Sequence, residues 1–172
     1  SNNLSYTISL SRNNTYTNPI FPVGGSNFII SGKFTPPFSL ISGIDYSNLE
    51  NDKEFQRIIN GTPTPDVAKI DQEKFKWLEF YKIKFSGEWY TSLIDKLVLK
   101  TKAAFGFLGT YNQDRGNIPF ERFFVGGDGM MNYSLDGREN IQMRGYENQS
   151  LSSIDGSIIY NKFALELRYP IS

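Results

Sequence analysis

Apolar and polar residues alternate along five segments of this chain. Each segment is expected to form a β-strand, because successive side chains of a strand point to opposite faces of a sheet. In one of them, the apolar residues Ile83 and Phe85 alternate with Lys82 and Lys84. The expected strands lie at about residues 3–13, 26–36, 75–90, 96–110 and 156–169.

The connections between these segments predict an antiparallel sheet with unequal ends. Connections 14–25 and 91–95 are short, whereas connections 37–74 and 111–155 are long. Because neighbouring antiparallel strands run in opposite directions, the short connections share one end and the long connections share the other. This is the layout of outer-membrane β-barrels, which have short periplasmic turns and long external loops. A short helix is expected at 51–60 within the first long connection.

The two faces of the expected strands differ strongly. One face is apolar, and the other carries lysines and a glutamate in the middle of strands. This pattern, along strands longer than the typical ~5–6 residues, fits a membrane barrel with lipid outside and a polar lumen inside. A soluble sheet with one solvated face would show the same alternation. We therefore expect an all-β fold, an antiparallel transmembrane β-barrel. Because such barrels need about eight strands or more, we expect residues 1–172 to be part of a larger barrel.

Composition removes several classes of function. The chain has 18 Lys and Arg and 18 Asp and Glu, so its formal net charge is zero and a nucleic-acid partner is not indicated. It has no Cys and no His, which excludes thiol and imidazole catalysis and the usual zinc sites. We expect no enzyme activity, no cofactor and no metal site. Alternation places Glu79 on the opposite face from Glu88 and Glu166, so a glycosidase carboxylate pair is not expected.

The second long connection is unusually rich in aromatic residues and glycine for a loop. It contains FERFFVGG at 120–127 and IQMRGY at 141–146. Arg144 keeps its charge, and its planar fork suits a carboxylate, so in a narrow lumen it needs a partner. Gly145 permits positive φ, and Tyr146 offers a packing surface with a hydroxyl. A loop of this kind is expected to fold back onto another part of the protein.

These two motifs resemble the sixth extracellular loop of the BamA family, the core of the machine that assembles outer-membrane β-barrels. The sequence NPIFPVGG at 18–25 resembles the family's periplasmic turn, and FALELRYP at 163–170 resembles the strand after the loop. The resemblance covers nearly the whole chain in the family's order. It implies strands eight to twelve of a sixteen-stranded barrel of the bacterial surface antigen type, with the other strands and the periplasmic POTRA domains outside this chain.

The resemblance also implies a site. In that family the loop folds into the lumen, and its arginine pairs with a lumen carboxylate. Met143 stands where the family usually has a branched aliphatic residue, and a methionine fills the same kind of irregular space. The implied residues are the motif Met143, Arg144, Gly145 and Tyr146, the lumen partner Glu166, and Gly126 and Gly127 where the loop turns into the barrel.

The function that the resemblance implies is the folding and insertion of β-barrel proteins into the bacterial outer membrane without ATP. The implied partners are unfolded outer-membrane proteins, accessory lipoproteins, the lipid bilayer and lipopolysaccharide. A two-partner secretion transporter or a TamA-like factor would share the loop motif. A passive porin or ligand-binding barrel, or a soluble carbohydrate-binding β domain, is an alternative of another class.

Overall fold

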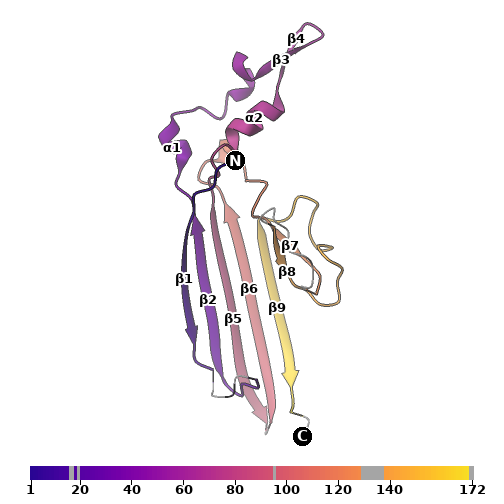
Figure 1. The fold of residues 1–172 in the computed structure, drawn as a ribbon. Coiled ribbons are helices and arrows are strands. Elements are labelled where there is room, and N and C mark those ends of the chain that lie inside the picture. Colours follow the sequence, from indigo (N-terminus) through magenta and orange to yellow (C-terminus); the bar gives the residue numbers. More distant parts are fainter. Residues whose placement is uncertain (16–17, 19, 95, 129–137, 171–172) are drawn as a thin grey trace.

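The computed structural model describes residues 1–15, 18, 20–94, 96–128 and 138–170. Its main element is a five-stranded sheet in the order β1-β2-β5-β6-β9, and every neighbouring pair is antiparallel (Figure 1). The five strands that the alternation predicts are thus confirmed. None of the helices in the described ranges is long and apolar enough to cross a membrane. The strands are β1 (Tyr6–Asn13), β2 (Gly25–Phe34), β5 (Tyr81–Ile94), β6 (Leu97–Gly109) and β9 (Ile159–Arg168).

Short and long connections lie at opposite ends of the sheet. The β1–β2 and β5–β6 connections are at the lower end in Figure 1, and both long connections begin and end at the upper end. This is the arrangement that loop length predicts.

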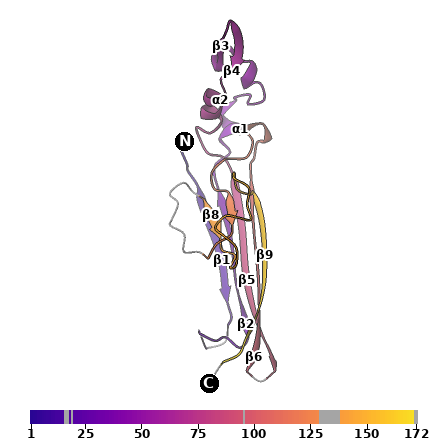
Figure 2. The ribbon, with the colours of Figure 1, turned by 90° about the vertical axis from the view of Figure 1, so that its right-hand side faces the viewer.

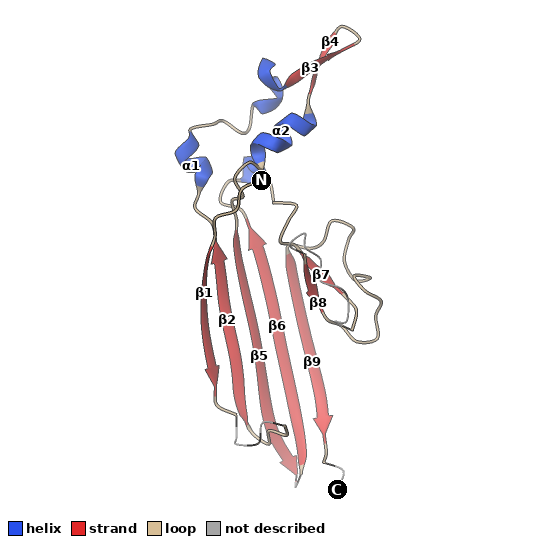
Figure 3. Ribbon diagram, in the orientation of Figure 1, coloured by secondary structure: helices blue, strands red, loops and turns tan. Residues whose placement is uncertain are grey.

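The first long connection forms a small domain above the sheet (Figure 3). Of the helix expected at 51–60, only the first part is helical, as short 3-10 turns, and residues 56–65 form a hairpin instead. Asn60 and Gly61 have φ values of 50° and 81°, as a two-residue hairpin turn requires, and β-branched Ile58 and Ile59 favour the strand before it. The elements are α1 (Phe38–Ser42), η1 (Leu49–Asn51), η2 (Lys53–Phe55), β3 (Gln56–Ile59), β4 (Thr62–Pro65) and α2 (Val67–Lys74).

The register places most apolar side chains of the five strands on one face. Ile8 lies opposite Gly32, and Gly32 lies opposite Ile83, so these positions share that face. Its side chains are largely exposed, and Phe163 of β9 retains 78% of its accessible surface. An exposed apolar face of this extent fits contact with lipid. The other side of the sheet, the polar face, carries the lysines.

The second long connection folds back against the polar face (Figure 2). We call residues 110–158 the inner loop. It contains η3 (Gln113–Arg115), β7 (Phe123–Val125) and β8 (Glu139–Ile141), and β7 and β8 pair in parallel. The buried residues between this loop and the upper part of the sheet are Leu78, Phe80, Ala104, Leu108, Ile118, Phe123 and Tyr160.

Strand β5 begins six residues later than the alternation predicts, at Tyr81 rather than Phe75. The face assigned to Glu79 from the alternation is therefore wrong, because this residue precedes the strand. Its side chain is buried in an ion pair with Arg115 of the inner loop. The approach to β5 is shaped by that pair and not by the period of a strand.

Candidate functional site

Backbone hydrogen bonds give the inner loop a fixed shape. Phe123 and Ser157 exchange two of them, with N···O distances of 2.9 and 2.8 Å. The amide of Leu151 donates to the Val125 carbonyl at 3.1 Å on the same edge of β7, and β8 pairs with the other edge. Gly106 of β6 leaves room for β7 against the sheet, because a Cβ atom at this position would lie 2.7 Å from the Phe123 ring. The loop is thus an ordered layer on the polar face.

Gly126 and Gly127 follow β7 and receive the returning part of the loop. Their φ values are 130° and 91°, which side chains rarely adopt. The amide of Gly127 donates to the Tyr146 carbonyl at 3.1 Å, and the amide of Met143 donates to the Gly127 carbonyl at 2.9 Å. A Cβ atom at Gly126 would lie 2.9 Å from the amide nitrogen of Gln149. The two glycines therefore let the segment that carries the motif pack closely against the end of β7.

The motif itself forms a turn at the tip of the inner loop. The amide of Tyr146 points to the Met143 carbonyl at 3.4 Å, and Gly145 has a φ of 88°. Tyr146 keeps 53% of its surface exposed. Arg144 is also exposed, and Met143 is half-buried.

Met143 and Arg144 line a depression of about 450 Å³ between the loop tip and strands β6 and β9. The depression is rich in positive charge. Glu166 is a single carboxylate among its residues, and the ammonium of Lys162 donates to the Gln142 carbonyl of the loop. The cations that line it are Lys100, Lys102, Arg144, Lys162 and Arg168.

Glu166 lies on the polar face opposite Lys100, as the alternation predicts. Its carboxylate accepts two hydrogen bonds from Arg168, at 3.0 and 3.3 Å. Arg144 and Glu166 face the same depression. The pairing of Arg144 with Glu166 stays a prediction.

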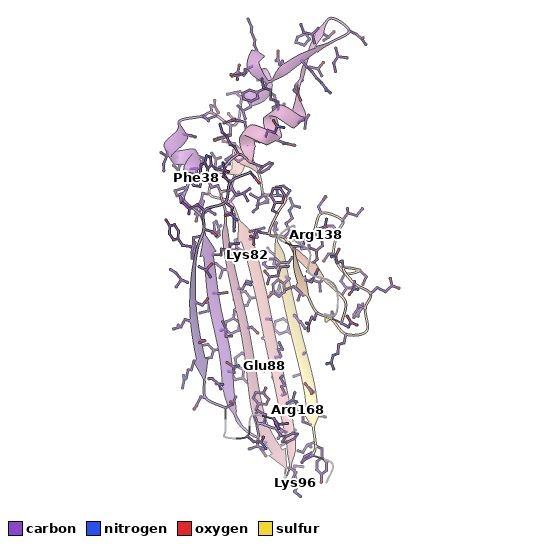
Figure 4. All side chains as sticks on the ribbon, in the orientation of Figure 1. Phe38, Lys82, Glu88, Lys96, Arg138 and Arg168 are labelled. Atoms are coloured by element: carbon purple, nitrogen blue, oxygen red, sulfur yellow. The ribbon has the colours of Figure 1, made fainter. Side chains whose placement is uncertain are left out.

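A chain of ion pairs joins the inner loop to the sheet closer to the upper end, where Lys82 is labelled in Figure 4. The Lys82 ammonium lies 2.7 Å from a Glu139 oxygen and 3.4 Å from a Glu121 oxygen. Lys33 pairs with Glu121, and Lys84 lies 2.9 Å from Glu139. Sequence reasoning found the lysines and missed both glutamates, because nothing in their spacing relates a loop carboxylate to a particular strand position.

The electrostatics of Glu139 follow from this position. Burial raises the pKa of its carboxyl group, but the hydrogen bonds and charges of Lys82 and Lys84 outweigh burial and hold the pKa below its ordinary value. Glu139 is therefore ionised at neutral pH and acts as a permanent partner of the two lysines.

A second buried pair connects the inner loop to the domain above the sheet. Arg115 lies 2.6 Å from a Glu79 oxygen, and it also donates to the Trp77 carbonyl at 2.6 Å. The same carboxylate accepts from the amide and the hydroxyl of Ser39, each at 2.7 Å. The Tyr46 ring covers the guanidinium at 5.0 Å. The two long connections are thus fixed to each other.

The lower half of the polar face has its own cluster. Glu88 lies 3.2 Å from the ammonium of Lys100 and 3.0 Å from that of Lys102, and it accepts from the Tyr90 hydroxyl at 3.0 Å. Figure 4 shows Glu88 and Arg168 below Lys82. These charges pair within the sheet, and Lys100 and Lys102 also line the depression beside Met143 and Arg144.

The sequence model of the Omp85 superfamily domain matches residues 1–172. No curated protein matches the chain significantly. Members of the superfamily are outer-membrane β-barrel proteins that act in protein insertion or secretion, and the exposed apolar face and the inner loop on the polar face agree with that architecture. The chain belongs to the Omp85 superfamily.

Proposed function

We propose that this chain forms the rear wall and the inner loop of a BamA-type insertase, which folds β-barrel proteins into the bacterial outer membrane without ATP. The observation that supports this most strongly is the inner loop itself. It returns along the polar face and carries the Met143–Tyr146 turn to a depression on the wall. A passive porin would give no role to an Arg144-Gly145-Tyr146 turn at this place.

In the proposed mechanism, one side of the barrel opens and the opposite side stays rigid. An insertase of this type opens a lateral seam between its first and last strands, where a substrate strand can pair with an exposed edge. The opposite wall must keep its shape while the seam opens. A loop tied to that wall by buried ion pairs stiffens it, because the loop and the strands then move as one body. We propose that an Arg144–Glu166 pair adds a further tie at the loop tip.

The proposed partners match the two faces of the sheet. The apolar face would contact lipid acyl chains and, in the outer leaflet, lipopolysaccharide. Unfolded outer-membrane proteins would be the substrates, and accessory lipoproteins would bind other parts of the assembled machine. Two-partner secretion and TamA-like transporters of the same superfamily would use the same wall, so the test must separate insertion from secretion.

The test is reconstitution of the full-length protein into liposomes with a urea-unfolded outer-membrane barrel as the substrate. The folded fraction is followed by resistance to protease and by heat-modifiable migration in gels. An insertase speeds folding relative to empty liposomes and to liposomes that contain an unrelated porin. A protein that conducts ions but leaves the folding rate unchanged would contradict the proposal. Transport of one exported protein without faster barrel folding would identify a secretion transporter instead.

A further inference from the structure

Three lysines form a compact positive patch on the upper polar face. Lys33 of β2 and Lys82 of β5 are direct register partners, and Lys84 lies two residues further along β5 on the same face. Like charges directly opposite each other on neighbouring strands destabilise a sheet. The bare wall would therefore be under electrostatic strain at this place.

The inner loop brings two carboxylates to that patch. Glu121 lies between Lys33 and Lys82, and Glu139 lies between Lys82 and Lys84, so positive and negative groups alternate. The Lys82 side chain is only 4% exposed, and its ammonium also donates to the Glu121 carbonyl at 2.8 Å and lies 4.6 Å from the Phe123 ring centre. The central cation is thus satisfied entirely by groups of the inner loop.

We infer that the five alternating charges, Lys33, Glu121, Lys82, Glu139 and Lys84, are a latch that holds the inner loop against the barrel wall. The latch is separate from the Arg144 motif, which sits at an exposed depression further down the wall. A buried ion pair adds little net stability in itself, but removing one partner leaves an uncompensated buried charge. Docking therefore depends on the two glutamates, because without them Lys82 is buried beside two other cations.

Release of the latch need not unfold the sheet. The strands pair with one another through their own backbone registers, and no strand of the main sheet belongs to the inner loop. An undocked loop would return the three lysines to water, where their mutual repulsion is weak. The latch thus controls whether the loop covers the wall, whatever reaction the barrel performs.

Residues 1–172 contain no cysteine, so a thiol introduced here can report on loop position once any cysteine elsewhere in the full-length protein is replaced. Ala104 of β6 lies beneath the inner loop and is 8% exposed, whereas Ala164 of β9 lies on the same face and is exposed. A104C should react slowly with a soluble maleimide in the full-length protein in liposomes, and A164C should react quickly. In E121Q/E139Q, A104C labelling should rise by roughly tenfold or more while A164C labelling stays constant.

A third substitution separates the latch from a general loss of contacts. K82M removes the buried cation that the glutamate substitutions leave unpaired, and it keeps a long side chain against Phe123. Adding K82M to E121Q/E139Q should return A104C labelling toward the slow rate, because a buried charge has been replaced by an apolar group. If the double variant does not form a heat-modifiable barrel, single E139Q carries the same test, with a smaller acceleration that K82M reverses. Unchanged A104C protection in the glutamate variants, or acceleration that K82M makes worse, would overturn the inference.

Discussion

Arg115 and Glu79 form a buried ion pair that joins the two long connections at the upper end of the sheet. The guanidinium lies 2.6 Å from the carboxylate, and the side chains are 4% and 1% exposed. One residue comes from the inner loop, and the other precedes β5, where it also binds Ser39 of α1. The domain above the sheet and the loop on the polar face are therefore mechanically linked.

This pair predicts a large and asymmetric cost of substitution. R115M should destabilise the upper domain by ~3–5 kcal/mol, because Glu79 is left buried without its cation. R115M/E79L should be more stable than R115M. The measurement is limited proteolysis of the first long connection as denaturant is added. K76Q is the control, since Lys76 and Glu73 form an exposed pair that should contribute no more than about 1 kcal/mol.

The Arg144 motif predicts a charge-swap result. R144E and E166R should each reduce assembly of outer-membrane proteins in cells that depend on the variant, and R144E/E166R should recover part of it. Arg168 already binds Glu166, so R168Q should strengthen the dependence on Arg144 rather than replace it. Wild-type behaviour of both single variants would show that the proposed tie at the loop tip does not exist.

An alanine at Gly126 is predicted to clash with the backbone, whereas an alanine at Gly145 is not. G126A combines an unfavourable φ with a collision against the backbone of Glu147 and Gln149, for a cost of ~2–5 kcal/mol in loop docking. Gly145 has a φ of 88° but open space around it, so G145A should cost only ~1–2 kcal/mol. Labelling of A104C in each background compares the two. Equal labelling rates would contradict the role of Gly126 and Gly127 in packing the returning part of the inner loop.

Glu139 predicts acid release of the inner loop. Its pKa is lowered when the loop is docked, so its contribution to docking is complete above the pKa of the free carboxyl group, ~4.3, and is lost as pH falls through the docked value. The groups that face it are Lys82, Lys84 and Tyr160, and Glu121 lies on the other side of Lys82. Hydrogen exchange in β7, corrected for the intrinsic effect of pH, should accelerate at acidic pH. E139Q should show fast exchange already at neutral pH, with little further change.

The alternation of residues such as Ile83 and Lys84 was sufficient to predict the sheet. A strand between lipid and a polar lumen must keep one face apolar along its whole length, so the period of two stays visible in the sequence. The loop lengths then predict which connections share each end of the sheet. The hairpin at Asn60–Gly61 carries a recognised turn signal, but the polar residues before it fit a short helix as well.

The partners of the lysines could not be predicted in the same way. Glu121 and Glu139 lie in short or irregular segments, where no period assigns a face. Their contacts with Lys82 depend on how the inner loop folds back, which is set by backbone bonds at Phe123 and by the glycine pair. The alternation assigns Glu79 to the wrong face because it continues back to Phe75, whereas β5 begins at Tyr81. Long-range charge pairs of this kind are visible only in three dimensions.

The proposed function is tested most directly by depleting the protein in its own bacterium and measuring the outer-membrane proteome over time. An insertase predicts that many unrelated β-barrel proteins decline together and that their unfolded forms accumulate in the periplasm, before cell growth slows. Re-expression of the wild-type protein should restore them. Unchanged levels of other barrel proteins, or loss of a single secreted protein, would contradict the account.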